Sequence, residues 1–586
     1  MKRVTFIRSL MEFNKRVLCQ GMIDNVSKYT MSDLKQKLFF NKVFINNTQE
    51  MFQKHNMNSI MDEYIDELRQ YINNVNAIIS RLTKENDNIR ISREDSFERR
   101  LSIEGKTYQQ ISSKVYININ DINLDNFIDD HIYYISILDT GDYMISYVDM
   151  KSAIYRDVIS CQMDGYKTYW KTDDCIRDHI RYTFYTIDTI AFKITRQAKT
   201  NEIVKVEYNG STEFMKKIIS MFPKNALIVS NPFMYIDDIN MIIEDNDQDT
   251  PSVMKADFNP MTLEELMTKD GIIEYPNDSF DEYLQFLSLA SKRNDVKSIY
   301  ITLYRIGKDP SIFYILRDAV NNGIKVYVNV ELCASGESIN RMWMREMRNA
   351  GMYVFTYESG SIKVHCKLTL VEFENGSRLA QIGTGNYHTQ TASQYTDLSI
   401  ITGDNLICKQ VKKVFDILTC NIDPDSVKFN KSLLVSRFNA RQELCKLIEI
   451  EALKGSDGYI AIKCNALDDY RIIECLDRAA MNGCKIDLII RGVCTWIPDE
   501  NANVKIKSII WDKLEHSRVF CFGKSNPTIY IGSLDLVSKK LNHRIETLVL
   551  LKDPDVIIKI CDYMNRYVTN TKNSWVQTSY GMYIKE

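Results

Sequence analysis

Apolar residues in the first hundred positions recur at three- and four-residue spacing, for example along SIMDEYIDELRQYINNVNAIISRL from Ser59. This spacing places the apolar side chains on one face of a helix. We therefore predict a helical N-terminal domain over residues 1–107. From residue 108 the pattern changes to β-branched and aromatic runs. HIYYISILDTGDYMISYVDM, from His131, holds two strand-like stretches around a Thr-Gly-Asp turn, and we predict an α+β head domain over 108–262.

Beyond residue 262 strand-like and helix-like segments alternate. The apolar runs VKSIYITL, IKVYVNVEL and MYVFTY are separated by amphipathic stretches. Such alternation is typical of an α/β sheet with crossover helices. Ser279 and Glu282 are expected to form a capping box at the start of one helix, FDEYLQFLSLASK.

This part of the chain repeats itself. RDAVNNGIKVYVNVEL, from Arg317, resembles DRAAMNGCKIDLIIRG, from Asp477. Three further matches follow in the same order: KVHCKLTLV with LEHSRVFCF, QIGTGN with YIGSLD, and YTDLSIITG with RIETLVLLK. The unit is far longer than a solenoid repeat. We predict two α/β domains of one fold, over 263–428 and 429–586, packed as a pseudo-twofold pair.

The repeat carries a histidine beside a cation in each half. On a predicted strand over 361–371, His365 and Lys367 share one face, and His516 and Arg518 match them in the second half. This doubled arrangement suits phosphoryl chemistry. One imidazole attacks phosphorus, the cations neutralise phosphoryl oxygens, and the second imidazole serves the leaving or entering oxygen.

Two carboxylates belong to the same matched segments. Asp397 and Glu546 occupy equivalent positions and are candidates for holding each imidazole in the right tautomer. The plainer alternative is that each histidine and its neighbouring cation form an ordinary surface pair. Their matched placement in the repeat argues against that alternative.

The two histidines are not expected to be equivalent. Lys363 and Lys367 on the face of His365 should depress the pKa of that imidazole and keep it neutral, as a nucleophile requires. Glu515 and Glu546 should favour the protonated form of His516, which suits a proton donor.

Charge and composition narrow the class of protein. The chain has 74 Lys and Arg against 77 Asp and Glu, which argues against a chain-wide nucleic-acid binder. Its 14 Cys are scattered without a CxxC pair, so reduced thiols are expected rather than disulfides or a zinc site. No apolar run approaches the roughly 18–20 residues that span a bilayer, and charges interrupt the N-terminal stretch. We predict a cytoplasmic protein with no integral membrane segment and no nucleic-acid partner.

Two HxK/HxR strands in tandem domains resemble the phospholipase D superfamily. More specifically, the chain resembles the class 1 polyphosphate kinases over nearly its whole length. The matching stretches include YPNDSFD, ITLYR, NNGIKVYVNVEL, KVHCKL, GTGNYHTQTASQYTDLSIIT, LIIRGVCTWIP, LEHSRVF and LNHRIETLV. The resemblance implies a helical N-terminal domain, a head domain and two phospholipase D-like α/β domains related by internal duplication.

The resemblance also implies roles for individual residues. His365 stands at the position of the phosphorylated nucleophile, and His516 at the second essential histidine, beside the nucleotide phosphates. Lys367 is expected to be catalytic and to bind phosphate. The nucleotide-binding positions are Asn47, Tyr395, Arg491 and His516. The phosphate-binding positions are Arg305, Lys367, Arg518, Lys463 and Asn465, and Arg305 is also a family magnesium-site position.

One departure from the family concerns a missing cation. The family has a KARFDEEAN-like run after the VEL strand, whereas this chain reads ELCASGESIN, with Ser335 where the arginine is expected. Losing one cation from a phosphate site costs about 10³-fold in rate if nothing replaces it. Lys363, Lys367, Arg341 and Arg345 are candidates to compensate.

The predicted activity is reversible transfer of the ATP γ-phosphate to inorganic polyphosphate, with Mg²⁺ and a phosphohistidine intermediate. The partners are ATP or ADP and polyphosphate. The resemblance leaves open a homo-oligomer (dimer or tetramer) and peripheral membrane association. Two alternatives remain at this stage: a phospholipase D-like phosphodiesterase, and a non-catalytic paralogue that binds polyphosphate or nucleotide.

Overall fold

The computed structural model describes residues 2–3, 6–20, 37–38, 40–41, 44–45, 61–84, 89–91, 111–116, 119–127, 131–148, 159–163, 166–170, 176–177, 180–181, 186–197, 200–231, 261–304, 311–331, 337–357, 362–420, 422–511 and 513–586. The chain divides into two compact units, residues 14–250 and residues 1–13 with 251–586. The four-domain scheme with its boundaries stays a prediction.

The smaller unit combines one long helix with two sheets. Helix α3 (Met61–Lys84) lies within the predicted helical region. A six-stranded sheet follows, in the order β10 (Leu227–Ser230), β9 (Ile203–Asn209), β8 (Thr186–Arg196), β4 (Tyr133–Leu138), β5 (Tyr143–Val148) and β3 (Ile111–Tyr116). A three-stranded sheet has the order β2 (Ile89–Ile91), β7 (Tyr166–Trp170), β6 (Ile159–Met163), and α6 is Thr212–Ile218. The predicted Thr-Gly-Asp hairpin is confirmed, because β4 and β5 are antiparallel and Gly141 turns with a φ of +87°.

The larger unit contains two big sheets, and the first is built by residues before 403. Its strands run in the order β11 (Gly271–Tyr275), β18 (Tyr395–Thr402), β17 (Arg378–Gly383), β16 (Lys367–Phe373), β12 (Val296–Leu303), β13 (Lys325–Val330) and β14 (Tyr353–Phe355). β12, β13 and β14 are parallel neighbours, and the other pairings along this order are antiparallel.

The second sheet follows the same plan. Its order is β19 (Leu433–Val435), β28 (Thr547–Leu550), β26 (Thr528–Gly532), β25 (Val519–Phe522), β20 (Tyr459–Cys464), β21 (Lys485–Ile490) and β23 (Val504–Ile509), extended by β29 (Ser574–Gln577) and β30 (Tyr583–Lys585). β20, β21 and β23 are parallel neighbours, as β12, β13 and β14 are. Both sheets therefore place one histidine segment just before the antiparallel neighbour of the first parallel strand.

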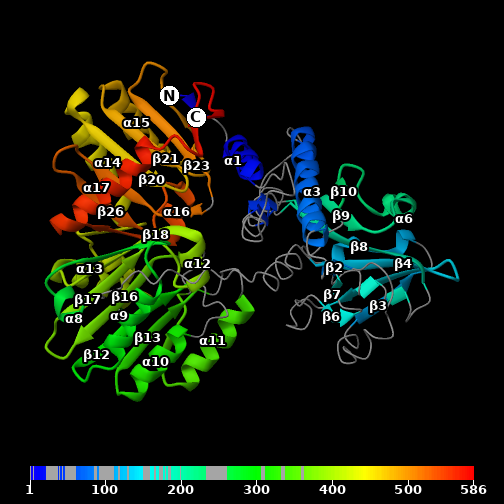
Figure 1. The fold of residues 1–586 in the computed structure, drawn as a ribbon, viewed down its shortest axis with the longest axis horizontal. Helices are drawn as coiled ribbons and strands as arrows, with labels where there is room; N and C mark the ends of the chain where they lie inside the picture. The colour runs from blue at the N-terminus through cyan, green and yellow to red at the C-terminus, as the bar shows by residue number, and fades with distance from the viewer. Residues whose placement is uncertain are drawn as a thin grey trace. The chain divides into compact units, whose positions relative to one another are not determined.

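Helices cover the sheets in layers. α9 (Asp281–Ser291), α10 (Ser311–Asn321) and α11 (Glu337–Asn349) belong with the first sheet, and α14 (Ala440–Ala452) and α15 (Tyr470–Met481) with the second. α13 (Asn405–Leu418) and α17 (Pro554–Thr569) pack in a core shared by both halves, where Leu368 and Val414 meet Val519 and Ile560. In Figure 1 the green first half lies against the orange and red second half, with β18 at the junction. The mixed α/β class predicted from the alternating pattern is confirmed.

Short segments complete this unit. They are α8 (Leu263–Leu266), α12 (Thr389–Gln394), α16 (Ser538–His543), β1 (Lys2–Arg3), which pairs with β22 (Trp496–Ile497), and the first residues of α1 (Phe6–Gln20). The predicted capping box at Ser279 is wrong. The Ser279 hydroxyl instead accepts a hydrogen bond from the N–H of Asp281, two residues on, while Thr262 and Glu265 form a capping box at α8.

The predicted continuous strand over 361–371 is also wrong, and the reason matters for the site. β15 (Lys363–Val364) pairs with β27 (Arg544–Ile545) of the other half, and β16 begins only at Lys367. At the break, the N–H groups of His365 and Cys366 both donate to the carbonyl of Ile545. The second half mirrors this: β24 (Leu514–Glu515) pairs with β18, and the N–H groups of His516 and Ser517 donate to the carbonyl of Thr396. Each histidine therefore follows directly after a short strand that pairs with a strand of the other half.

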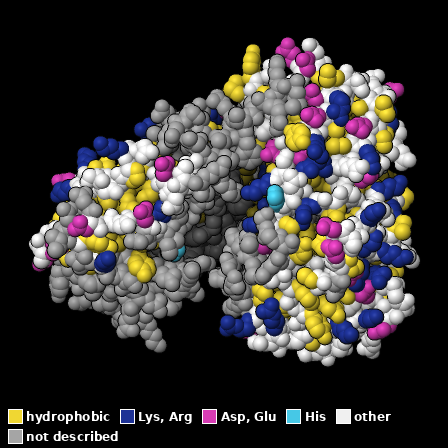
Figure 2. Space-filling view, turned by 180° about the vertical axis from the view of Figure 1, so that it is seen from behind, with side chains coloured by type: hydrophobic (Ala, Val, Ile, Leu, Met, Phe, Trp, Pro, Cys, Tyr) yellow, Lys and Arg dark blue, Asp and Glu magenta, His cyan; other side chains and the backbone are white. Residues whose placement is uncertain are grey.

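The surface of the described part is mixed in charge. On the larger unit, Figure 2 shows Lys and Arg side chains interspersed with Asp and Glu, with a histidine visible beside Lys and Arg. Among the described residues, no helix is long and apolar enough to cross a membrane.

Candidate active site

The first histidine is held by a carboxylate from the opposite sheet. Nδ1 of His365 lies 2.9 Å from Oε2 of Glu546, which precedes β28. Both side chains are buried, with His365 only 9% exposed. The Tyr304 ring is nearly perpendicular to the imidazole, with 4.7 Å between ring centroids. No described residue forms a hydrogen bond to Nε2 of His365.

The second histidine repeats the arrangement with the halves exchanged. Nδ1 of His516 lies 2.9 and 3.0 Å from the two carboxylate oxygens of Asp397, on β18. Asp397 also accepts from the hydroxyl of Thr384, and that hydroxyl accepts from the N–H of Leu398. The structure thus brings all four predicted residues together, and each carboxylate holds the imidazole of the other half.

Burial lowers the pKa of both imidazoles. The pKa of His365 falls to about 3, because burial and the Lys367 cation outweigh Glu546. The pKa of His516 falls to about 4, because burial and Arg518 outweigh Asp397. The prediction that His365 is neutral is supported, although burial rather than the lysines is the main cause. The prediction that His516 favours its protonated form is wrong for the ligand-free protein.

The carboxylates are ionised partners. Although burial opposes their charge, the adjacent imidazole and cations hold the pKa of Glu546 and that of Asp397 below their usual values. A neutral imidazole beside an ionised carboxylate carries its proton on the nitrogen that faces the carboxylate. Nδ1 therefore donates in each pair, and Nε2 carries the lone pair.

Lys367 lies beside His365 and is almost inaccessible, at 1% exposure. Its ammonium donates to the carbonyl of His365 and lies 5.3 Å from the Tyr304 ring centroid. Burial, followed by the Arg518 charge, lowers its pKa to about 7 despite Glu546. Because its charged form is destabilised by burial, an anion that binds next to Lys367 would stabilise the ammonium and raise its pKa.

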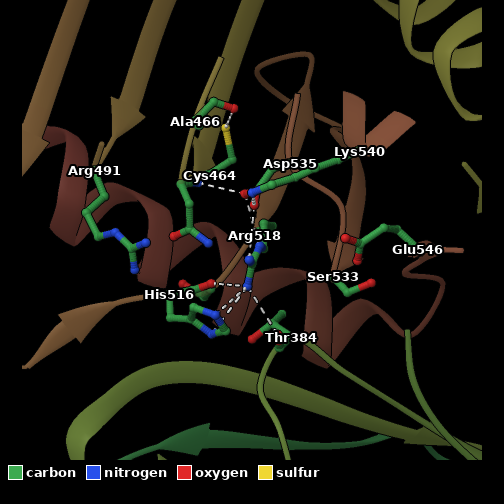
Figure 3. Close-up of polar contacts among 12 residues, drawn as sticks. Thr384, Cys464, Ala466, Arg491, His516, Arg518, Ser533, Asp535, Lys540 and Glu546 are labelled. Carbon is green, nitrogen blue, oxygen red and sulfur yellow. Dashed lines mark hydrogen bonds and ion pairs between the residues drawn. The ribbon is translucent and has the colours of Figure 1, made fainter. Parts of the chain in front are cut away.

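Arg518 lies at the equivalent position beside His516, and unlike Lys367 it forms an ion pair with a described carboxylate, that of Asp535. Its Nε and Nη2 donate to the two oxygens of Asp535 at 3.1 and 3.2 Å, and Lys540 binds the same carboxylate at 2.7 Å. Its Nη1 donates to the carbonyls of His516 and Thr384 and lies 3.3 and 3.2 Å from Nδ1 and Nε2 of His516 (Figure 3). The guanidinium thus lies against the His516 ring.

Asp535 was missed by the sequence reasoning. It lies in YIGSLD, the segment matched to QIGTGN, where the first half has the neutral Asn386. The charge difference inside a matched segment was a usable signal. Arg518 and Lys540 hold the pKa of Asp535 well below its usual value although burial opposes this, so the carboxylate is ionised and pairs with the guanidinium as an anion.

Two predicted nucleotide-binding residues also converge on His516. The Tyr395 ring lies 5.2 Å from the imidazole, centroid to centroid. Arg491 follows β21 and donates from Nη1 to the carbonyl of Glu515 at 2.8 Å. In Figure 3 its side chain and that of Arg518, which precedes β25, both extend toward His516. Burial next to Arg518 lowers the pKa of Arg491 to about 10, so it stays charged at neutral pH.

The remaining predicted phosphate ligands have protein partners. The amide of Asn465 accepts from Nε of Arg518 at 3.2 Å and donates to the carbonyl of Glu515 at 3.1 Å in the orientation that satisfies both groups. Lys463 forms a buried ion pair with Glu515, 2.7 Å from Nζ to Oε2. Both residues lie beside the His516 segment, and their phosphate-binding roles stay predictions.

Several predicted positions fall outside the described residues. These are Asn47, Arg305 and Ser335, which includes the family magnesium-site position. Among the described residues there is no group of three His, Cys, Asp or Glu side chains suited to a metal ion. Asp397 and Glu546 each already bind an imidazole. The described part therefore contains no protein cage for Mg²⁺.

Two buried histidines on duplicated sheets, each with a neighbouring cation and a carboxylate from the other half, define a paired site of the kind that suits phosphoryl chemistry. Residues 261–424 match the polyphosphate kinase C-terminal domain 1, and residues 433–586 match the polyphosphate kinase C-terminal domain 2. A polyphosphate kinase of Vibrio cholerae is 30% identical over 504 residues, which cover 76% of this chain and 71% of that protein. The chain belongs to the polyphosphate kinase family, as its motifs predicted.

Other relatives agree over a shorter span. Polyphosphate kinase 1 of Chlorobaculum tepidum is 34% identical over 358 residues, covering 58% of this chain and 51% of that protein. The match thus spans about half the length of that relative. The crystal structure of polyphosphate kinase from Porphyromonas gingivalis aligns with all of this chain and 96% of its own, with a TM-score of 0.74 and 23% identity. That likeness supports the overall fold.

Proposed function

We propose that the chain transfers the γ-phosphate of ATP to inorganic polyphosphate through a phosphohistidine on His365, and that the transfer is reversible. The observation that carries the proposal is the contrast between the two imidazoles. Nε2 of His365 has no hydrogen-bond partner among the described residues, while the Arg518 guanidinium lies against the His516 ring, with Nη1 3.3 and 3.2 Å from its two nitrogens. A nucleophilic imidazole becomes positively charged as it attacks, and an adjacent guanidinium opposes that charge on His516.

The first step is attack of Nε2 of His365 on the γ-phosphorus of ATP. The new N–P bond forms as the bond to the ADP oxygen breaks, and ADP leaves. The developing positive charge on the ring is offset by Glu546, which accepts the Nδ1 proton in a hydrogen bond. Lys367 and Arg518 neutralise the phosphoryl oxygens.

His516 and Arg491 would serve the ADP side. His516 is neutral without ligand, but phosphate oxygens beside its ring would stabilise the imidazolium and raise its pKa. It could then donate a hydrogen bond to the departing oxygen. Arg491 and Tyr395 would contact the nucleotide. In the second step the terminal phosphate of a polyphosphate chain attacks the phosphohistidine, and a phosphoanhydride replaces a phosphoanhydride, so reverse synthesis of ATP is expected.

We expect Mg²⁺ to bind together with the nucleotide, through the phosphate oxygens of ATP. Mg²⁺ in phosphoryl-transfer sites is commonly bound by substrate phosphates with one or two protein groups, and it supplies charge neutralisation there. The described residues do not form a site of their own for it. Every step above is therefore assigned to side chains of the chain itself.

The test is a chain-growth assay with ATP, Mg²⁺ and a polyphosphate primer, scored by product length on gels. We expect growth with the native chain, growth with His543→Ala, an exposed histidine on α16, and none with His365→Ala. Hydrolysis of bis(p-nitrophenyl) phosphate without chain growth would favour the phosphodiesterase alternative. Nucleotide binding without any turnover would favour the non-catalytic paralogue. Either result would refute the proposal.

A further inference from the structure

A buried ion pair lies directly behind His516. Lys463, on β20, and Glu515, on β24, are each 2% exposed, with Nζ and Oε2 2.7 Å apart. The ammonium also donates to the hydroxyl of Ser517 at 2.5 Å and lies 4.6 Å from the Tyr567 ring centroid. Lys463 thus binds the residues on both sides of His516.

The carboxylate of Glu515 extends the contact to the partner of His516. It accepts from the hydroxyl of Thr396 at 2.8 Å and from the indole of Trp511. Thr396 directly precedes Asp397, and its carbonyl accepts from the N–H groups of His516 and Ser517. The pair therefore connects the chain segment of the imidazole to the chain segment of the carboxylate that orients it.

At the equivalent described positions of the first half there is no such pair. Ser298 and Tyr459 hold equivalent register positions, opposite Lys325 and Lys485, so Thr302 is the counterpart of Lys463. The Thr302 hydroxyl donates to the carbonyl of Cys366 and accepts from the N–H of Leu368. In the first half, the segment after His365 is therefore held by the neutral hydroxyl of Thr302, whereas the His516 segment of the second half is held by the charged pair Lys463–Glu515.

The positive charge of Lys463 is already paired with the carboxylate of Glu515. The Glu515 carboxylate outweighs the effect of burial, and the pKa of Lys463 is raised above its usual value. The charge of Lys463 is balanced one to one by Glu515, whereas Arg518 and Lys540 share the single carboxylate of Asp535 and keep an excess positive charge. Removing one member of the Lys463–Glu515 pair leaves an unpaired charge in a low-dielectric interior. This argues against Lys463 as a phosphate ligand.

We propose that Lys463 and Glu515 act together as positioning residues, which hold the His516 segment against Asp397 and do not bind phosphate. The inference rests on the proposed function of His516. Its consequence is that loss of either side chain acts on the transfer step through His516 rather than on nucleotide affinity.

Glu515→Gln separates the two roles most clearly. If Lys463 bound phosphate, removing the neighbouring anion would preserve or tighten ATP binding. If the pair positions His516, Glu515→Gln and Lys463→Met should each lower kcat by about 10²-fold and change the KM for ATP less than about threefold. The double variant should lose less than the product of the two single losses, because both remove one interaction.

A second readout does not depend on activity. In the full chain with ¹⁵N-labelled histidine, the His516 ring signals are assigned by comparison with His516→Gln. Lys463→Met, Glu515→Gln and the double variant should each shift the pKa or tautomer balance of His516. The matched control is Lys507→Met, which removes another buried lysine of the same sheet, paired with Glu586 at 3.0 Å, and should leave these signals unchanged.

Three results would overturn the inference: unchanged His516 signals in Glu515→Gln, single losses that multiply in the double variant, or a loss confined to the KM for ATP. If Lys463→Met does not fold, Glu515→Gln still decides through its own signals. Because the spectra need no substrate, they decide the positioning role even if the chain lacks polyphosphate kinase activity.

Discussion

Nδ1 of His365 and Oε2 of Glu546, 2.9 Å apart, join the two halves of the larger unit at the point of the proposed chemistry. The reciprocal contact joins His516 to Asp397. Neither half can orient its own histidine, because the carboxylate comes from the other half in both cases. This exchange is the feature that makes one site out of two duplicated sheets.

Glu546→Gln tests that exchange. The amide keeps the shape of the side chain but removes the charge, and it can turn its NH₂ group toward Nδ1, which would move the imidazole proton to Nε2. We expect phosphorylation of the protein to slow by roughly 10²- to 10⁴-fold, measured as the initial rate of labelling from γ-labelled ATP. The control is Glu451→Gln, a buried glutamate bonded to Lys454 and the N–H of Tyr459. Equal losses in the two variants would contradict the orienting role.

Arg518→Lys should be costly although it keeps the charge. Lysine cannot bind both oxygens of Asp535 and reach His516 at once, as the guanidinium does. We expect kcat to fall by about 10²- to 10³-fold. Arg441→Lys changes a similar two-donor contact, to Asp469, and should leave kcat within about threefold. A near-native Arg518→Lys enzyme would show that the fork geometry is unimportant.

The pH dependence of kcat/KM should reflect Lys367, whose pKa is lowered to about 7 in the free protein. Below pH 7 the ammonium is charged and can bind phosphate, and above pH 7 it becomes neutral. We therefore expect kcat/KM to fall about tenfold per pH unit above 7, and to show no loss near pH 6.5 from His365, whose pKa is about 3.

Lys367→Arg is the matching control for this pH profile. Arginine stays charged throughout, and the second half already has Arg518 at the equivalent position. The fall above pH 7 should disappear in this variant, whatever its absolute rate. If the fall persists, another group is responsible for it.

Leu418→Ala tests the shared core. Leu418 ends α13 and is fully buried among residues of both halves. Its truncation should lower the free energy of unfolding by roughly 2–5 kcal/mol, measured by denaturant titration. Because Leu418 belongs to neither histidine–carboxylate pair, kcat below the melting temperature should stay within about twofold. A large drop in kcat would show that core packing and the site are more tightly coupled than the structure indicates.

The sequence alone predicted most of the residues that form the two histidine–carboxylate pairs. Matched segments identified both histidines, both carboxylates and the cations Lys367 and Arg518, because a duplicated site repeats its residue types in order. Alternation along 362–370 puts Val364, Cys366, Leu368 and Leu370 on the face away from His365 and Lys367, and these four residues lie in a core.

The sequence could not predict the features that depend on the tertiary arrangement. Local patterns do not show that β15 and β24 each pair with a strand of the other half, so the sequence did not indicate which carboxylate would bind which histidine. Burial, which dominates the imidazole pKa values, depends on packing that adjacent charges do not indicate. Asp535 and the Lys463–Glu515 pair act through contacts between strands far apart in sequence, and the matched segments show only that such residues differ between the halves.

Mapping the phosphohistidine tests the central claim most directly. The native chain is incubated with γ-labelled ATP, and the labelled peptide is identified by mass spectrometry at neutral to basic pH, where phosphohistidine survives. We predict phosphate on His365 alone, slower labelling at the same position in His516→Ala, and no labelling in His365→Ala. Phosphate on His516 in the native chain, or label that persists in His365→Ala, would contradict the account.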